Sequence, residues 1–209
     1  MRDEIFSWDR HPEPILHGDP PEQPTLPPAL VALGPYYSIA SLEPFHDQGQ
    51  RYELVDGELL VNWRVSYRHQ RLMSGLVPDL GTYLEPVPEL ESIMQVWVQS
   101  GTDTLLLPDL MVMPAHRLRR EEPCPLEELL LVVEILDYDS VHTDRFTKRV
   151  RYQRAGIGTC WLVDPTREVI DVWTPGATLP VVQRDEVRWR APGLDSDFVV
   201  DVPALFRTP

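Results

Sequence analysis

The sequence predicts an α/β fold in which helices flank a mixed β-sheet. Two observations support this prediction. Segments with strand-like hydrophobic patterns recur along the chain, and two segments with helical spacing of apolar residues, 66–85 and 144–155, lie among them. With 209 residues, of which 43% are hydrophobic and 25% charged, the chain is long enough for one domain with a sizeable core.

The start of the chain is predicted to be a separate N-terminal arm, because proline is concentrated there. The stretch HPEPILHGDPPEQPTLPP, at 11–28, is typical of an irregular or polyproline II segment. Periodic patterns begin at Tyr36. We therefore expect a proline-rich arm at 1–35 and one folded domain at 36–209.

The first half of the domain begins with short elements. Residues 36–45 predict a short amphipathic helix or a turn. Residues 51–63, RYELVDGELLVNW, predict a hairpin about Asp56-Gly57, a strong two-residue hairpin signal. The helix predicted at 66–85 would be kinked or divided by Pro78.

Two further segments predict strands. Side chains alternate along 92–100, which predicts a single strand there. The segment 104–114, TLLLPDLMVMP, predicts a strand that is interrupted at Pro108-Asp109.

The stretch LLLVVEIL, at 129–136, predicts a strand that is buried on both faces. Its one charged residue is Glu134. A buried carboxylate without a partner is costly or becomes protonated. We therefore expect Glu134 to have specific partners.

The remaining elements follow in the order helix, strand, strand and helix. The helix after the loop is expected to end at Ala155, with Gly156 as its stop. A strand at 159–165 is expected to form a hairpin with 167–175, and the tail at 199–206 is expected to form a short helix.

The composition also restricts location and partners. The two cysteines are far apart, which fits a reduced setting and excludes a zinc site built on thiolates. No apolar run approaches the ~20 residues of a membrane span, and the first residues lack the pattern of a secretory signal. These features predict a cytoplasmic protein that does not enter a membrane.

The net charge of −14 argues against non-specific binding to nucleic acid. The segment 144–155 nevertheless has five basic residues and one acid. This local basic segment is either a solvated helix face or an element that meets a phosphate.

Three acids stand beside strand-like sequence where apolar residues are expected: Glu58, Asp109 and Glu134. Adjacent strands lie about 4.8 Å apart, so Asp109 and Glu134 at matching heights would hold one cation between them. Ligation by carboxylate oxygens suits Mg²⁺, with waters in the remaining positions.

Lys148 shares a helical face with Asp144 and Tyr152, each four residues away. Two interpretations are open from the spacing. Lys148 forms a surface ion pair with Asp144, or its ammonium reaches the acidic cluster and stabilises charge that develops on phosphorus.

Seven motifs in a fixed order resemble those of one known family. They are YELVDGELL (52–60), HQ (69–70), LLLPDLMV (105–112), VVEIL (132–136), DRFTKRVRYQRAGI (144–157), WLVDP (161–165) and VDVPALF (200–206). The chain resembles the Uma2 (DUF820) family, a branch of the PD-(D/E)xK nuclease superfamily, over roughly 36–206.

The resemblance implies a restriction-endonuclease-like core, a Mg²⁺ or Mn²⁺ site and hydrolysis of phosphodiester bonds in DNA. It implies that Asp109 and Glu134 bind the metal and that Glu58 is the acid of the first core element. Much of the superfamily has its lysine two residues after the second acid, where this chain has Leu136. The Uma2 pattern places the lysine on the following helix, which Lys148 matches.

Other residues have less specific expected roles. His69 matches a family histidine that supports the site, contacts a phosphate or is structural. The candidates for support of the site are His69, Asp144 and Tyr152. The candidates for contact with the DNA backbone are Arg145, Arg149 and Arg151. A homodimer is expected because cutting both strands favours two sites.

The chain departs from the family in the loop after Glu134. Family members often have a Ser-Pro-Ser-like loop there, whereas this chain has DYDS, which adds Asp137 and Asp139 near the site. Both bind a second metal or solvate the loop. With the net charge of −14, they favour an alternative function, in which a weak or inactive nuclease fold serves as a binding or assembly module.

Overall fold

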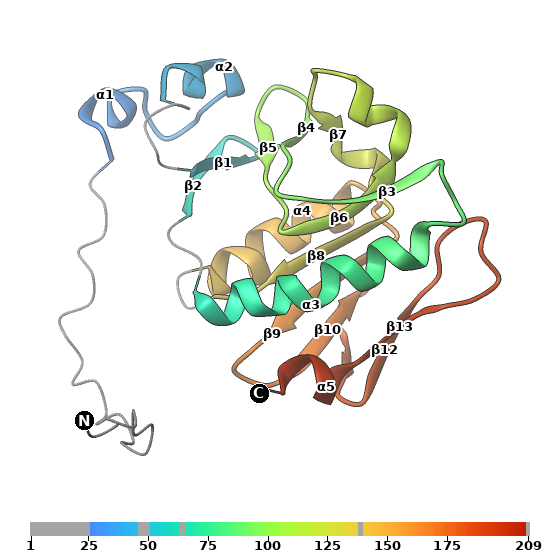
Figure 1. The fold of residues 1–209 in the computed structure, drawn as a ribbon. Helices are drawn as coiled ribbons and strands as arrows, with labels where there is room; N and C mark the ends of the chain where they lie inside the picture. Colours follow the sequence, from blue (N-terminus) through green and yellow to red (C-terminus); the bar gives the residue numbers. More distant parts are fainter. Residues whose placement is uncertain (1–25, 46–50, 63–65, 138–139, 208–209) are drawn as a thin grey trace, which may run out of the picture.

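A six-stranded mixed sheet lies at the centre of the computed structural model, which describes residues 26–45, 51–62, 66–137 and 140–207. Its strand order is β11-β10-β9-β8-β6-β3 (Figure 1). The strands are β3 (Leu90–Met94), β6 (Leu110–Pro114), β8 (Leu131–Ile135), β9 (Thr159–Asp164), β10 (Val169–Trp173) and β11 (Val181–Gln183). The central strand β8 pairs antiparallel with β6 and parallel with β9. All five residues of β8 are buried, as the apolar run predicted.

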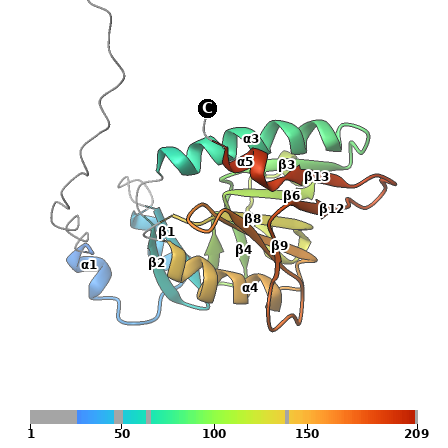
Figure 2. The ribbon, with the colours of Figure 1, turned by 90° about the horizontal axis from the view of Figure 1, so that it is seen from below.

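Helix α3 (Tyr67–Leu84) covers one face of this sheet, and helix α4 (Arg149–Arg154) lies on the opposite side (Figure 2). The α3 face also packs against the hairpin of β12 (Glu186–Trp189) and β13 (Phe198–Asp201) and against helix α5 (Val202–Phe206). Alternation along β8 directs Leu131, Val133 and Ile135 into this core. The other β8 side chains therefore face α4.

Pro78 lies inside α3 without dividing it. A proline in a helix interior removes one backbone hydrogen bond and costs about 3 kcal/mol. Leu72, Leu76 and Leu80 are buried on one face of α3 on both sides of the proline. Their burial stabilises the continuous helix and offsets the lost bond.

A second core lies between α4 and a five-stranded sheet, whose order is β2-β1-β5-β4-β7. Its strands are β1 (Arg51–Val55), β2 (Glu58–Asn62), β4 (Val98–Ser100), β5 (Thr104–Leu106) and β7 (Cys124–Pro125). Val55 of β1 and Leu106 of β5 meet Val132 of β8 and Tyr152 of α4 in this core. The two sheets thus enclose the helix that follows β8.

The predicted hairpin at 51–63 is confirmed over the described residues by the pairing of β1 with β2. Asp56 and Gly57 both have positive φ angles, 50° and 81°, as a type I′ turn requires. A side chain at position 57 would overlap the ring of Tyr36, so glycine is needed for space as well as for conformation.

The single strand predicted at 92–100 is wrong. The segment forms β3 and β4, which belong to different sheets, and Gln95 between them has a φ of 52°. The backbone N–H of Gln95 donates to the carbonyl of Pro108 at 3.1 Å. The interruption predicted at Pro108-Asp109 is confirmed, and it is also a change of sheet, from β5 to β6.

The helix predicted at 144–155 is present, but its first part is a π-helical segment, η4 (Thr143–Lys148), which continues into α4. Gly156 follows α4 with a φ of 77°, as expected for a helix stop. The hairpin of β9 and β10 is confirmed. The tail predicted as a helix is strand β13 followed by α5, whose N-cap is Asp201.

Short helical elements complete the structure. They are α1 (Pro28–Val31), α2 (Ile39–Leu42), η1 (Glu43–Phe45), η2 (Ala115–Arg119) and η3 (Leu126–Glu128). Leu30 of α1 and Leu42 of α2 are fully buried against Leu54 and Leu105. Residues 26–35, the described end of the arm predicted at 1–35, therefore pack on the domain, and the rest of that arm, 1–25, lies outside the described residues. No helix in the described ranges combines the length and apolarity needed to cross a bilayer.

Candidate active site

Asp109 and Glu134 lie side by side at the ends of adjacent strands. Glu134 lies two residues after Val132 and therefore on the same face of β8, so its side chain faces η4 and α4. The register pairs Leu110 with Val133, and the next step along both strands brings Asp109 beside Glu134. Asp109 Oδ2 also accepts a hydrogen bond of 2.8 Å from the backbone N–H of Ile135. The structure thus brings Asp109 and Glu134 together, as their spacing along the sequence predicted.

His69 supports Asp109 from the first turn of α3. Its Nε2 lies 3.0 Å from Asp109 Oδ2, and its side chain is 3% exposed. Ser66, the N-cap of α3, accepts a hydrogen bond from the His69 backbone and donates its own N–H to Asp137 Oδ2. Burial lowers the pKa of His69, but the hydrogen bond to Asp109 and the nearby acids outweigh it and raise that pKa. The acids around His69 therefore favour its protonated form more than water would.

Lys148 is buried among three carboxylates. Its Nζ lies 2.7 Å from Glu53 Oε2, 3.3 Å from Asp144 Oδ1 and 3.4 Å from Glu134 Oε1. Burial alone would lower the pKa of Lys148, but the surrounding carboxylates raise it well above its ordinary value. Of the two interpretations left open by the sequence, the ammonium inside the acidic cluster is the one observed.

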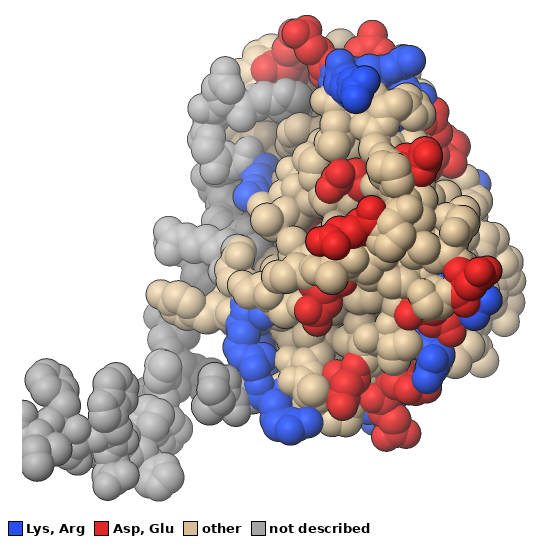
Figure 3. Space-filling model, turned by 45° about the vertical axis from the view of Figure 1, so that its right-hand side comes forward, with Lys and Arg blue, Asp and Glu red and all other residues tan. Residues whose placement is uncertain are grey.

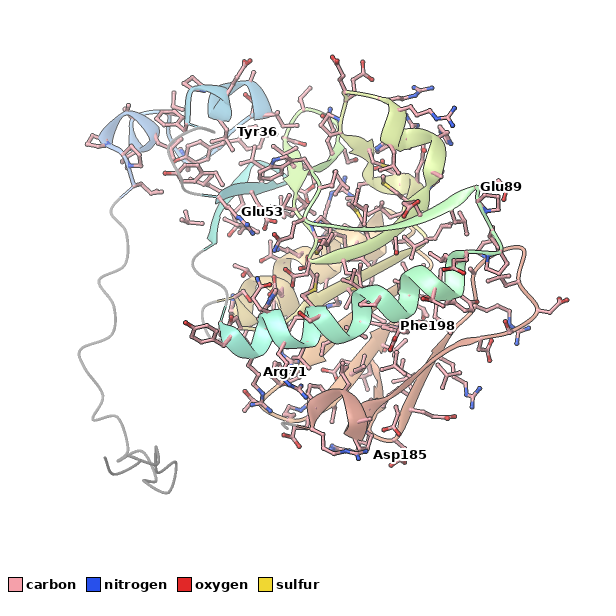
Figure 4. The ribbon with its side chains drawn as sticks, viewed as in Figure 1. Tyr36, Glu53, Arg71, Glu89, Asp185 and Phe198 are labelled. Atoms are coloured by element: carbon pink, nitrogen blue, oxygen red, sulfur yellow. The ribbon has the colours of Figure 1, made fainter. Side chains whose placement is uncertain are left out.

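The structure does not bring Glu58 to this cluster. Glu58 is exposed at the start of β2. Glu53, which is labelled on β1 in Figure 4, is 1% exposed, and its Oε2 contacts Lys148 Nζ. Glu53 Oε1 also accepts a hydrogen bond of 2.7 Å from the backbone N–H of Leu107. The sequence had a signal for Glu53, since it is an acid between the apolar residues Tyr52 and Leu54, which are buried in β1. The same reasoning had found Glu134.

Tyr152 and Asp144 complete the surroundings of Glu134. The Tyr152 hydroxyl donates to Glu134 Oε1 at 2.5 Å, and Tyr152 is fully buried. Burial raises the pKa of Glu134, Asp144 and Tyr152. Three carboxylates facing a single ammonium leave excess negative charge, so Glu134 without a further cation favours its protonated form.

The comparisons with known proteins bear on the family and the fold. The family model of Uma2, described as "Putative restriction endonuclease", matches residues 37–203. The chain belongs to the Uma2 family. A crystal structure of a putative nuclease belonging to DUF820 from Anabaena variabilis ATCC 29413 is similar, with a TM-score of 0.67 and 18% sequence identity. The match covers 81% of this chain and 97% of that chain. No curated protein matches the sequence.

These matches confirm the expected fold class. The Uma2 chain has a restriction-endonuclease-like α/β fold with mixed sheets and flanking helices. The family supports a nuclease-like function, which is a hydrolase function. The roles of individual residues remain predictions, and they depend on the geometry described above.

The donor set of the Uma2 chain fits Mg²⁺ as a two-carboxylate site. Within the described residues, no group of three or more His, Cys, Asp or Glu side chains is arranged to hold a metal ion. Mg²⁺ does not need one, because it commonly keeps several waters and binds one or two carboxylates together with substrate phosphates. The described contacts of Asp109 use Oδ2 and those of Glu134 use Oε1, so each acid has a second oxygen for such a ligand role.

The three arginines expected at the DNA backbone make contacts within the chain. Arg145 pairs with Asp164 and, at 2.8 Å, with Asp171. The Arg149 guanidinium lies 4.1 Å from the centre of the Trp173 ring. Arg151 Nε lies 3.2 Å from Asp56 Oδ1. Each guanidinium thus already has a partner within the chain, and contact of these arginines with DNA stays a prediction.

Acidic residues outnumber basic ones in the Uma2 chain, 33 to 19. Figure 3 shows Asp and Glu side chains spread over the face drawn there, with Lys and Arg in separate groups nearer its edge. This distribution agrees with the net charge of −14. An acidic surface weakens the sequence-independent attraction to DNA, so binding would depend on a few local contacts.

Proposed function

We propose that this protein is a metal-dependent DNA endonuclease that hydrolyses phosphodiester bonds. The observation that supports this best is the arrangement of Asp109, Glu134 and Lys148. Asp109 and Glu134 lie side by side at the ends of β6 and β8, and Glu134 contacts the buried Lys148 ammonium, which also faces Glu53 and Asp144. Ionised groups are costly to bury, and such arrangements are typical of catalytic sites.

Asp109 and Glu134 are the proposed ligands of Mg²⁺ or Mn²⁺. A divalent cation there would polarise a phosphoryl oxygen and lower the pKa of an attacking water. The backbone N–H of Ile135 and the imidazole of His69 hold Asp109 in place, while the Tyr152 hydroxyl holds Glu134. These contacts keep both carboxylates oriented, as supporting residues do around metal ligands.

Lys148 is the proposed helix-borne catalytic lysine. Its ammonium stays protonated at neutral pH because carboxylates surround it, so it is suited to orient a water or to stabilise negative charge on phosphorus. Glu53 and Asp144 orient Lys148 from two sides, at 2.7 and 3.3 Å. We assign to Glu53 the role that the family resemblance implied for Glu58.

The assignment of Glu53 gives a direct comparison with Glu58. Glu53→Gln should lower the rate of plasmid nicking about 10- to 100-fold, the usual loss for a residue that orients a ligand or catalytic group. Glu58→Gln removes the same charge from an exposed position and should leave the rate unchanged. Equal rates for the two variants would contradict the role of Glu53.

The alternative is a binding or assembly module that keeps the nuclease fold with little or no catalysis. The acidic surface and the intramolecular contacts of Arg145, Arg149 and Arg151 favour this alternative. The cluster of Glu53, Asp109, Glu134 and Lys148 favours the enzyme, because a protein without catalysis would gain stability by replacing buried charges with apolar residues. A homodimer stays a prediction under either function.

Plasmid nicking tests the choice between the two functions. Supercoiled DNA is incubated with wild type and with Asp109→Asn, in Mg²⁺, in Mn²⁺ and in EDTA. Wild type should nick DNA with at least one metal and should be inactive in EDTA, and Asp109→Asn should be inactive throughout. A wild type that is inert with both metals on supercoiled, linear and single-stranded DNA would establish the alternative.

A further inference from the structure

A row of side chains facing η4 crosses three strands of the central sheet. The register pairs Glu134 of β8 with Leu162 of β9, and Leu162 with Asp171 of β10. Paired residues on adjacent strands have their side chains on the same face of a sheet. The row therefore has a carboxylate at each end and an apolar side chain between them.

Two cations of the η4 segment meet these two carboxylates. Lys148 Nζ lies 3.4 Å from Glu134 Oε1, and Arg145 Nη1 lies 2.8 Å from Asp171 Oδ2. The strands β8 and β10 are two strand spacings apart, about 9.6 Å. One contact would let η4 rotate about it, whereas two contacts at this separation fix the rotation of the segment over the sheet.

The Asp171 end of the row is built as a buried ion-pair network. The Asp171 side chain is 1% exposed, and that of Arg145 is 21% exposed. Arg145 also pairs with Asp164, whose Oδ1 accepts the backbone N–H groups of Thr166 and Arg167 and is thereby held in place. Arg167 contacts Asp171 from the more exposed side, at 2.9 Å. Arginine suits this place because its planar fork binds two acids at once.

We propose that Arg145 and Asp171 are positioning residues for the Lys148 ammonium. This inference rests on the proposed function, since it assigns Lys148 a role in catalysis. The contact of Arg145 with Asp171 attaches η4 to β10. This attachment determines the position at which Lys148 contacts Glu53 and Glu134. Arg145 then acts through Lys148 and makes no contact with DNA.

Kinetics of Arg145→Met separate positioning from DNA contact. Misplacement of a catalytic group by about 1 Å costs about 10²-fold in rate, so kcat for nicking should fall by roughly that factor. KM for DNA and its salt dependence should stay unchanged. A phosphate contact by Arg145 would instead raise KM and lower the salt slope by about 1, and that result would overturn the proposal.

Two further variants sharpen this comparison. Arg154→Met is the matched control, because Arg154 ends the same helix but is 68% exposed and pairs with Asp56. Its kcat should equal that of wild type. Arg145→Lys keeps the charge and reaches one of the two acids, so it should recover part of kcat. A loss in Arg154→Met equal to that in Arg145→Met would also contradict the proposal.

A double-mutant cycle tests whether Arg145 acts through Lys148. In a Lys148→Met background, Arg145→Met should lower the remaining rate less than twofold. If Lys148→Met is too unstable, the double variant Lys148→Met/Glu53→Gln serves as the background. This double variant removes one uncompensated acid together with the ammonium. An undiminished loss in that background would overturn the proposal.

The same cycle measured by urea unfolding does not depend on activity. Arg145→Met and Lys148→Met should shift the unfolding midpoint by less in combination than the sum of their separate shifts, whereas Arg154→Met and Lys148→Met should add. If wild type nicks no DNA, the proposed function fails, and the unfolding cycle still decides whether Arg145 holds Lys148 in place. Additive shifts for Arg145 and Lys148 would then reject the inference.

Discussion

Glu134→Gln should lose nicking activity while the protein keeps or gains stability. Glutamine keeps the size of the side chain and the acceptor for the Tyr152 hydroxyl. It removes the ionised ligand, so the rate should fall by at least ~10²-fold, the usual loss when one electrostatic group of an active site is removed. The measurement is plasmid nicking beside urea unfolding of the same preparations.

The pH dependence of stability shows why Glu134→Gln should keep or gain stability. Burial raises the pKa of Glu134 in the folded protein. Above the ordinary carboxyl pKa, the unfolded chain has released a proton that the folded protein still holds, so stability falls as pH rises toward the folded pKa. Glu134→Gln lacks this loss. In EDTA it should therefore equal wild type near pH 4 and be at least as stable as wild type at pH 8.

Metal provides the matching control for Glu134→Gln. A cation that binds only the folded state stabilises it, by about 2.7 kcal/mol at a concentration 100 times Kd. Millimolar Mg²⁺ or Mn²⁺ should raise the melting temperature of wild type and should not change that of the variant. A variant less stable than wild type at pH 8 in EDTA would instead identify Glu134 as a structural counterion of Lys148.

Lys148→Met should have the largest effect on stability in this protein. Lys148 is 3% exposed, and its ammonium is the cation that faces Glu53, Glu134 and Asp144. Removing one partner of a buried ion pair leaves an uncompensated charge and costs about 3–5 kcal/mol. The free energy of unfolding, measured in urea, should fall by this amount at neutral pH.

The loss in Lys148→Met should depend on pH. Without the ammonium, the buried acids keep their protons to higher pH than they do in the unfolded chain. Stability should therefore fall as pH rises above about 4, and the variant should be closer to wild type at pH 5 than at pH 8. In wild type the ammonium itself should not titrate below about pH 9, because the pKa of Lys148 is raised in the folded state.

Two controls accompany Lys148→Met. Arg154→Met removes an exposed cation from the same helix and should change stability by no more than about 0.5 kcal/mol. Glu53→Gln added to Lys148→Met should restore part of the loss, because one uncompensated acid is gone. Equal stability of Lys148→Met at pH 5 and pH 8 would contradict a buried acidic cluster.

Local patterns were sufficient for much of the fold. Period-two and helical spacing located β8, α3 and the hairpin of β9 and β10. The turn at Asp56-Gly57 followed from residue type, because only certain residues accept two successive positive φ angles. The single strand at 92–100 failed, since alternation does not tell which sheet a residue joins, and Gln95 turns the chain between two sheets.

The candidate site could likewise be predicted only in part from the sequence. Asp109 and Glu134 are found from the sequence because an acid beside or within an apolar strand is locally anomalous. Glu53 is equally anomalous, but the resemblance to the family implied Glu58, which lies in the same motif. A count of basic residues likewise does not show that Asp171 and Trp173 already contact Arg145 and Arg149.

The sequence by itself determined the α/β class, the buried strand β8, and an acid pair with a lysine on the next helix. These are local properties, fixed by hydrophobic period, turn residues and spacing. Only the tertiary structure decided that Glu53 joins the cluster and that Lys148 is buried there. It also decided that Arg145 meets Asp171 at the far end of one row. Those contacts depend on strand register and on the rotation of η4, which arise when two sheets and a helix pack together.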